Sequence, residues 1–172
     1  MSPATDHFYH YTVGIKLAGI IKADALMPAG VSAAPWEKPV LWFSRNPKWE
    51  PTATKILIAN GQTFRPSVAE LHERAGLYRF VAANPRIYAW QIINRKAGVR
   101  LGDIKQMEKL GRKLGALPSD WFGTLAVMPL TELDFERFNG QCWEPADLQE
   151  EADHWAALSK NVLQAKATEI GL

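Results

Sequence analysis

The stretch that decides the fold lies near the start of the chain and reads FYHYTVGIKLAGIIKADALMPAG (residues 8–30). Aromatic residues dominate its first positions, and this composition predicts a strand over residues 7–12. Side chains alternate between the two sides of a strand. The alternation puts Phe8, His10 and Thr12 on one face, and Tyr9 and Tyr11 on the other.

A helix is predicted directly after this strand. From Val13 to about Leu26 the apolar residues recur at helical spacing, and Thr12 precedes them as a candidate N-cap. Pro28 and Gly30 mark the point by which the helix has ended. The histidine of the first strand therefore stands just before a helix start.

Further strands and helices follow in an irregular order. A strand is predicted at residues 39–44 (PVLWFS), where Trp42 and Ser44 share a face, and a short one at residues 55–59 before the turn dipeptide Asn60-Gly61. A short helix is predicted at residues 67–75, with Ser67 near its start.

The last third of the chain predicts a hairpin and a helix. The sequence DFERFNGQCWEP (residues 134–145) turns at an Asn-Gly dipeptide, which would pair Glu136 with Trp143. Residues 146–168 predict a C-terminal helix, with acidic residues near its start and lysines toward its end. We therefore expect one α+β domain over residues 1–172, built as a mixed sheet with flanking helices.

The composition is that of an ordinary globular protein. Of 172 residues 47% are hydrophobic and 22% charged, which excludes wholesale disorder. Cys142 is the single cysteine, so no internal disulfide can form, and this points to a reducing cytoplasm. No stretch approaches the ~18 to 20 apolar residues that span a bilayer, so no membrane partner is expected.

Charge is distributed unevenly along the chain. Residues 91–115 carry seven basic residues against two acidic ones, whereas residues 132–153 carry eight acidic residues against one basic residue. Such a bipolar chain can steer a charged partner to one side, and a basic run can hold an acidic partner or a nucleic-acid backbone. The alternative is that both runs are solvated surfaces.

Common catalytic and metal motifs are absent from the sequence. The four histidines lack a zinc-binding context, and no glycine-rich phosphate loop or nucleophile elbow occurs. We therefore expect no metal site. Three segments remain that could carry chemistry: the strand with His10 and Thr12, the strand with Trp42 and Ser44, and the late acidic hairpin with Glu136.

The order of these segments resembles the ADP-ribosyltransferase superfamily. The resemblance rests on YHYT in the first strand and on the helix that ends in DALMPAG, and it covers roughly residues 8–50. It implies an ADP-ribosyltransferase-like fold that binds NAD and transfers ADP-ribose, with release of nicotinamide. The acceptor would be a protein, a nucleic acid or a small molecule.

The resemblance also implies roles for single residues. By position, His10 and Thr12 would hold the adenosine ribose of NAD. An aromatic residue would pack on the nicotinamide, for which Tyr11, Trp42 and Trp49 all remain candidates. The hydroxyl of Ser44 matches the serine or threonine of the family's second motif strand.

The family uses a late glutamate to stabilise positive charge on the ribose as nicotinamide leaves. A carboxylate does this best in a cleft that holds little water. Glu136 is the first choice for this catalytic role with His10, because its hairpin face also carries aromatic residues. Glu50 and Glu144 are alternatives, Glu50 as a further cofactor-binding residue. The family's paired glutamates for arginine acceptors are absent.

Two other functions stay open on the sequence alone. An RNA 2′-phosphotransferase would use a similar NAD cleft but needs more basic residues around it than Arg45 and Arg79. A non-enzymatic interaction or inhibitor protein, comparable to a toxin partner, would instead use the aromatic and bipolar surface to bind another protein.

Overall fold

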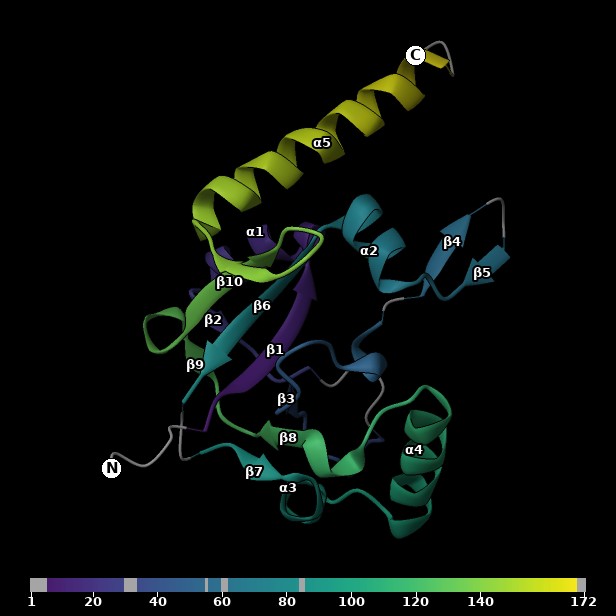
Figure 1. Ribbon diagram of the computed structural model, residues 1–172, viewed down its shortest axis with the longest axis vertical. Helices are drawn as coiled ribbons and strands as arrows, with labels where there is room; N and C mark the ends of the chain where they lie inside the picture. The colour runs from purple at the N-terminus through teal and green to yellow at the C-terminus, as the bar shows by residue number, and fades with distance from the viewer. Residues whose placement is uncertain (1–5, 30–33, 55, 60–61, 84–85, 170–172) are drawn as a thin grey trace.

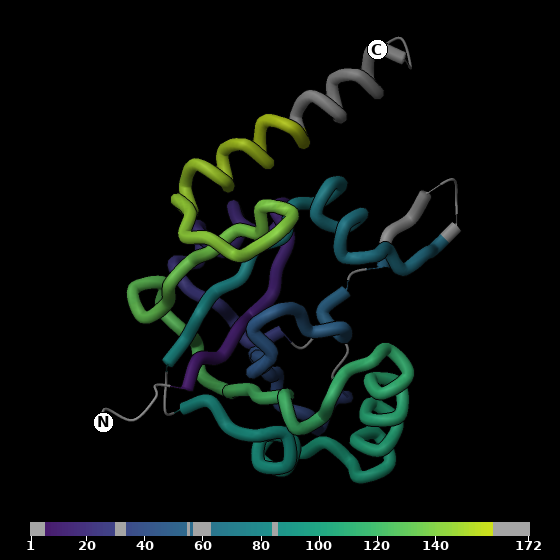
Figure 2. The backbone as a smooth tube through the Cα atoms, viewed as in Figure 1, coloured from purple at the N-terminus to yellow at the C-terminus, as the bar shows by residue number. Residues whose placement is uncertain are grey.

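The structure is a computed structural model that describes residues 6–29, 34–54, 56–59, 62–83 and 86–169. Figure 1 shows a twisted sheet in the middle of the molecule, with α5 (Leu148–Glu169) at one end and α4 (Leu101–Lys113) toward the other. The same chain path can be followed as a tube in Figure 2. The predicted α+β class is confirmed.

The central sheet has seven strands. In spatial order these are β11 (Trp143–Pro145), β10 (Asp134–Phe138), β6 (Leu77–Ala82), β1 (Phe8–Val13), β3 (Leu41–Ser44), β8 (Trp121–Thr124) and β7 (Tyr88–Ala89). Every strand pair of this sheet is antiparallel, so the expectation of a mixed sheet is wrong. Helices α3 (Trp90–Ala97) and α4 (Leu101–Lys113) connect the neighbouring strands β7 and β8, but the chain returns in the opposite direction and the two strands pair antiparallel.

Two short ribbons and five α-helices complete the described part of the fold. The ribbons are β2 (Ala25–Leu26) with β9 (Met128–Pro129), and β4 (Leu57–Ala59) with β5 (Gln62–Phe64). The helices are α1 (Leu17–Ala23), α2 (Val68–Ala75), α3 (Trp90–Ala97), α4 (Leu101–Lys113) and α5 (Leu148–Glu169). The predicted turn at residues 60–61 lies outside the described residues.

One face of the sheet, here called the core face, carries the main hydrophobic core. It includes Phe8, Leu41, Phe43 and Phe80, which are buried together. Helices α1 and α5 cover part of this face, where Leu17 of α1 packs with other buried side chains. Burying such large apolar side chains stabilises the fold by about 1.5 to 3 kcal/mol for each side chain.

The opposite face, here called the site face, is covered in separate places. Helix α2 packs Leu71 against one end of it, and Trp121 of β8 packs with Trp90 at the other end. Between these clusters the segment 45–50 crosses the sheet, as the blue segment in front of β1 and β3 in Figure 1 shows. This segment follows β3 directly and carries the residues described below.

The first helix is shorter than the sequence predicts. Thr12 stays in β1, paired with Tyr78, and does not cap a helix. A 3-10 turn over Gly14–Lys16 precedes α1, which ends at Ala23. Asp24 has a positive φ of 49°, and this left-handed residue stops the helix before the predicted end.

Helix α2 follows its prediction closely. The hydroxyl of Ser67 accepts a hydrogen bond from the backbone N–H of Glu70, and the Glu70 carboxylate accepts one in return. This reciprocal capping box fixes the helix start. Helix α5 is also confirmed at the predicted place, beginning after Asp147, whose carboxylate accepts from the Glu150 N–H.

The late hairpin is present, but its predicted register is wrong. Phe138 pairs with Trp143 and Glu136 with Pro145, so the loop has four residues instead of two. The side-chain oxygen of Asn139 accepts hydrogen bonds from the N–H groups of Gln141 and Cys142. These bonds replace the tight two-residue turn with a longer loop.

Candidate active site

A row of side chains crosses the site face from strand to strand. Tyr11 of β1 stands opposite Arg79 of β6, and Arg79 stands opposite Glu136 of β10. Residues directly opposite one another in antiparallel strands point to the same face. Tyr11, Arg79 and Glu136 therefore lie side by side, although 125 positions separate the first and the last in the chain.

Arg79 is the centre of this row. Its Nε donates to Oε2 of Glu136 at 2.5 Å, and its guanidinium carbon lies 4.3 Å from the Tyr9 ring centre and 4.6 Å from that of Trp143. The Arg79 side chain is only 9% exposed and the Glu136 side chain 23%. A cation between two aromatic faces is stabilised by both rings and by the carboxylate.

Three consecutive backbone carbonyls of the segment 45–50 are held by this part of the sheet. The hydroxyl of Tyr11 donates to the Asn46 oxygen at 2.5 Å, Arg79 donates to the Pro47 oxygen, and Nε1 of Trp143 donates to the Lys48 oxygen at 2.8 Å. The donors come from β1, β6 and β11. Burial raises the pKa of the Tyr11 hydroxyl above its ordinary value, so this group stays a donor at alkaline pH as well.

Ser44 and Glu50 belong to a buried cluster of hydrogen bonds next to the same segment. Oε2 of Glu50 accepts from the Ser44 hydroxyl at 2.9 Å, and Oε1 accepts from the Thr52 hydroxyl at 2.7 Å and from Nε1 of Trp121 at 3.0 Å. Glu50 is 6% exposed. A buried carboxylate with this many hydrogen-bond donors stabilises the fold. Ser44 and Glu50, which were both expected to bind the cofactor, therefore already use their polar atoms in hydrogen bonds within the protein.

His10 and Thr12 point away from this row. His10 stands opposite Phe80, and its ring contacts Phe43 with 5.8 Å between ring centres, so it belongs to the core face. Thr12 is buried on the same side. The sheet therefore separates these two predicted ribose-binding residues from Tyr11 and Glu136.

The ladder between β1 and β3 is short. These strands pair at Tyr9 and Ser44, and beyond that pair their ladder does not continue. In a continued ladder Trp42 would stand opposite Tyr11. Instead, Nδ1 of His10 lies 2.8 Å from the carbonyl oxygen of Trp42, and because a carbonyl only accepts, this nitrogen is the donor.

Trp42 also borders a hollow, here called the tryptophan cleft. Its volume is about 510 Å³, within the range of small-molecule sites, and its wall includes Trp36, Arg100, Asp103 and Gln106. The Trp42 side chain is 39% exposed. The Arg100 guanidinium carbon lies 3.8 Å from the Trp36 ring centre.

Sequence reasoning found some of these residues and missed others. Trp42 was identified from the alternation of its strand, and the hairpin face of Glu136 was recognised. Trp36 and Arg100 were missed, because they come from an irregular segment and from the residue before a helix. The place of Arg79 beside Tyr11 and Glu136 depends on strand order, for which no local pattern is a signal.

No group of three or more histidine, cysteine, aspartate or glutamate side chains that could hold a metal ion occurs among the described residues. No described helix is long and apolar enough to cross a membrane. Comparison with known proteins finds no family model, no curated protein and no solved structure that matches the chain.

Proposed function

We propose that the protein is an NAD-dependent ADP-ribosyltransferase with an ADP-ribosyltransferase-like fold. The observation that carries the proposal is the hydrogen bond from His10 of the YHYT strand to the carbonyl oxygen of Trp42, whose side chain lines the tryptophan cleft. The strand that resembles the family's first motif is thus bonded to the strand that resembles its second, and Trp42 of that second strand borders a hollow large enough for a ligand.

The wall of the tryptophan cleft fits one half of a dinucleotide. The indole of Trp42 offers a flat face for an adenine ring, and Arg100 offers a fork of donors for a pyrophosphate. The carboxylate of Asp103 can accept from ribose hydroxyls. His10 orients Trp42 through its hydrogen bond, and the buried Thr12 supports the strand.

Of the three candidate glutamates, Glu136 has the best environment for catalysis. Glu50 is buried with its donors, and Glu144 binds Arg137 at 2.8 Å and Asn139 at 2.9 Å. Glu136 shares the site face with Tyr11 and keeps part of its carboxylate exposed. Three strand spacings, roughly 14 Å, separate its strand from that of Trp42, so an extended dinucleotide would reach from the cleft to Glu136 along the outside of the segment 45–50.

The reaction needs a carboxylate beside the ribose from which nicotinamide leaves. In NAD the bond between ribose and nicotinamide is activated. When this bond breaks, its electron pair leaves with the nicotinamide ring. A lone pair of the acceptor then bonds to the same ribose carbon, and the acceptor's proton passes to solvent. Glu136 would stabilise the positive charge that develops on the ribose. Arg79 holds the carboxylate in position from its other side.

The test is nicotinamide release from NAD, measured with protein and nucleic-acid acceptors, together with the NAD-dependent shift in melting temperature. Glu136→Gln should lower kcat by about a hundredfold, as expected for loss of a charge-stabilising group. Trp42→Ala should raise KM by about tenfold, or 1.4 kcal/mol of lost binding.

Two matched variants serve as controls. Asp134→Asn changes another carboxylate on the site face of β10, and Ile92→Ala truncates a side chain with the same 39% exposure as Trp42 outside the cleft. Both should leave the kinetics unchanged. The proposal fails if the wild-type protein releases no nicotinamide with any acceptor and NAD does not shift its melting temperature. Retained folding with an unchanged biological effect in Glu136→Gln would instead favour an interaction protein.

A further inference from the structure

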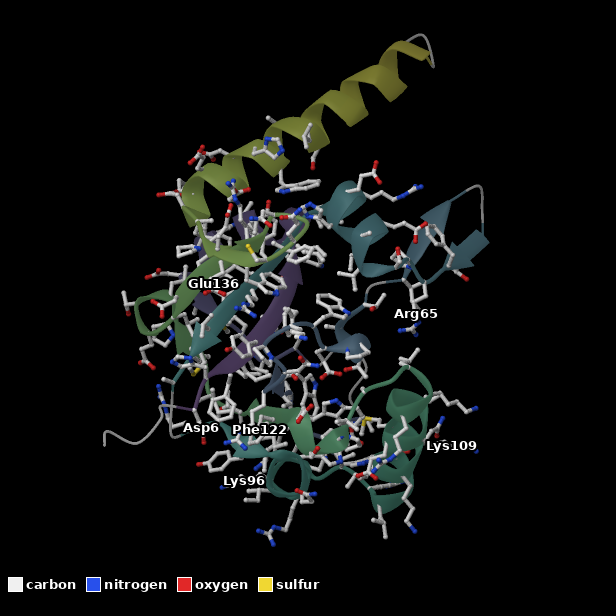
Figure 3. The ribbon with its side chains drawn as sticks, in the orientation of Figure 1. Asp6, Arg65, Lys96, Lys109, Phe122 and Glu136 are labelled. Atoms are coloured by element: carbon white, nitrogen blue, oxygen red, sulfur yellow. The ribbon has the colours of Figure 1, made fainter. Side chains whose placement is uncertain are left out.

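Helix α4 carries a row of cations on its outer side, here called the basic stripe. Its members are Lys105, Lys109, Arg112 and Lys113, and all four are exposed. Their spacing of four, three and one residues places them within about a third of the helix circumference. Figure 3 labels Lys109 on this outer side, well away from Glu136.

The basic stripe is not neutralised by the rest of the described protein. None of its four side chains takes part in an ion pair within the described part of the chain. The two acidic residues of α4 are directed elsewhere: Asp103 borders the tryptophan cleft, and Glu108 accepts from Nε1 of Trp90 at 2.7 Å. Four like charges on one exposed surface repel one another, and a polyanion would relieve this repulsion.

The stripe runs beside the tryptophan cleft. Gln106 and Leu110 of the same helix line the cleft, one side-chain row away from the cations. At the cleft mouth Trp36 is 52% exposed and stacks with the guanidinium of Arg100. A line of phosphate-binding cations next to an exposed aromatic platform is the arrangement that binds single-stranded nucleic acid without reading its sequence.

The charges on the rest of the molecule also favour binding of a polyanion at α4. The acidic residues of β10 and of the first turns of α5 lie at the end of the molecule opposite α4. A negatively charged strand is therefore repelled from one end and attracted to the other. An acidic protein would use the cations equally well, but the flat exposed indole of Trp36 also matches the planar face of a nucleobase.

We propose that the basic stripe and Trp36 form a binding site for single-stranded nucleic acid, with phosphates on the lysines and arginine and a base stacked on the indole. This site goes beyond the proposed function and does not depend on NAD. It would bring nucleic acid to the mouth of the tryptophan cleft. Binding and NAD chemistry can therefore be measured separately.

The experiment measures fluorescence anisotropy of a labelled single-stranded oligodeoxythymidine with the full chain, over a range of salt concentrations. Lys105→Glu/Lys109→Glu should weaken binding at least tenfold and reduce the slope of log K against log salt by about 1.4, which is two phosphate contacts at about 0.7 each. Trp36→Ala should weaken binding about fivefold while leaving the slope unchanged, because stacking releases no counterions.

The matched control is Lys16→Glu/Lys22→Glu, which makes the same change in net charge at two exposed lysines outside the basic stripe. It should bind like the wild-type protein. The proposal is overturned if the wild-type protein does not bind at low salt, or if both double variants lose affinity equally. It is also overturned if duplex DNA binds as tightly, or if polyglutamate competes as well as the oligonucleotide, since that would indicate an acidic protein partner.

Nicotinamide release distinguishes this site from the proposed function. Lys105→Glu/Lys109→Glu should release nicotinamide from NAD at the wild-type rate in the absence of nucleic acid. Oligonucleotide binding with no nicotinamide release would defeat the proposed function alone, whereas nicotinamide release without oligonucleotide binding would defeat this inference alone.

Discussion

His10 and Glu136 extend from opposite faces of the same sheet, two strands apart. His10 stands opposite Phe80 and Glu136 opposite Arg79, and these partners are consecutive residues of β6. Consecutive side chains of a strand point in opposite directions. His10 can therefore act on a ligand at the site face only indirectly, through its hydrogen bond to the Trp42 carbonyl.

Glu136→Gln should reduce the free energy of unfolding by about 2 kcal/mol, in addition to its expected effect on the reaction. The change leaves the nearly buried Arg79 without its charged partner, and a buried charge that loses its partner is costly. Chemical denaturation measures this loss. Asp134→Asn is the control and should stay within about 0.5 kcal/mol of the wild type, as surface substitutions usually do. An equal effect of both variants would contradict a specific pair.

Glu50→Ala should destabilise the protein by about 3 kcal/mol, because it leaves Ser44, Thr52 and Trp121 donors unpaired in a buried place. Glu50→Gln keeps one acceptor and should lose less. Urea denaturation of the three proteins gives the order. If Glu50→Ala were as stable as the wild type but released no nicotinamide, Glu50 would be a functional residue instead of an anchor.

Gly14→Ala should cost about 2 kcal/mol of stability. A Cβ atom at this position would lie 2.3 Å from ring atoms of Trp155, so the side chain that docks α5 would have to move. Gly19→Ala is the matched control, because no heavy atom lies within 4 Å of its Cβ, and helix propensity should give a gain of about 0.5 to 1 kcal/mol. Thermal unfolding should therefore shift in opposite directions for the two variants.

Stability should fall at alkaline pH. Burial raises the pKa of Tyr11 and of Tyr78 above the ordinary value, so the folded protein keeps two protons that the unfolded chain releases above about pH 10. The unfolded state then binds fewer protons, and the free energy of unfolding decreases as pH rises. Tyr11→Phe/Tyr78→Phe should flatten this decrease between pH 10 and about 11 in denaturation series. An unchanged slope would contradict the assignment.

Local signals predicted elements well where they acted within a few residues. Ser67 and Glu70 cap each other across one turn, so the start of α2 could be read from the sequence. The start of α1 could not, because Thr12 is held in the sheet by its pairing with Tyr78. The hairpin register failed for a similar reason, since the Asn139 side chain binds two backbone N–H groups and lengthens the loop.

The candidate site depended more on strand order than on local pattern. Alternation correctly separated His10 from Tyr11, but only the sheet shows that Glu136 shares the face of Tyr11 and lies across from His10. Glu50 and Trp121 are 71 positions apart, and no spacing rule predicts their hydrogen bond. The tryptophan cleft likewise joins an irregular segment to α4, which are distant in sequence.

The three carbonyls of Asn46, Pro47 and Lys48 have a consequence for how this segment moves. Their donors belong to three different strands, β1, β6 and β11. The segment 45–50 therefore cannot hinge open at one end while two of the three hydrogen bonds stay intact. Opening should be a single cooperative event. Amide hydrogens around these residues would then exchange with solvent at one common rate, because the segment 45–50 would behave as its own small unit of local unfolding.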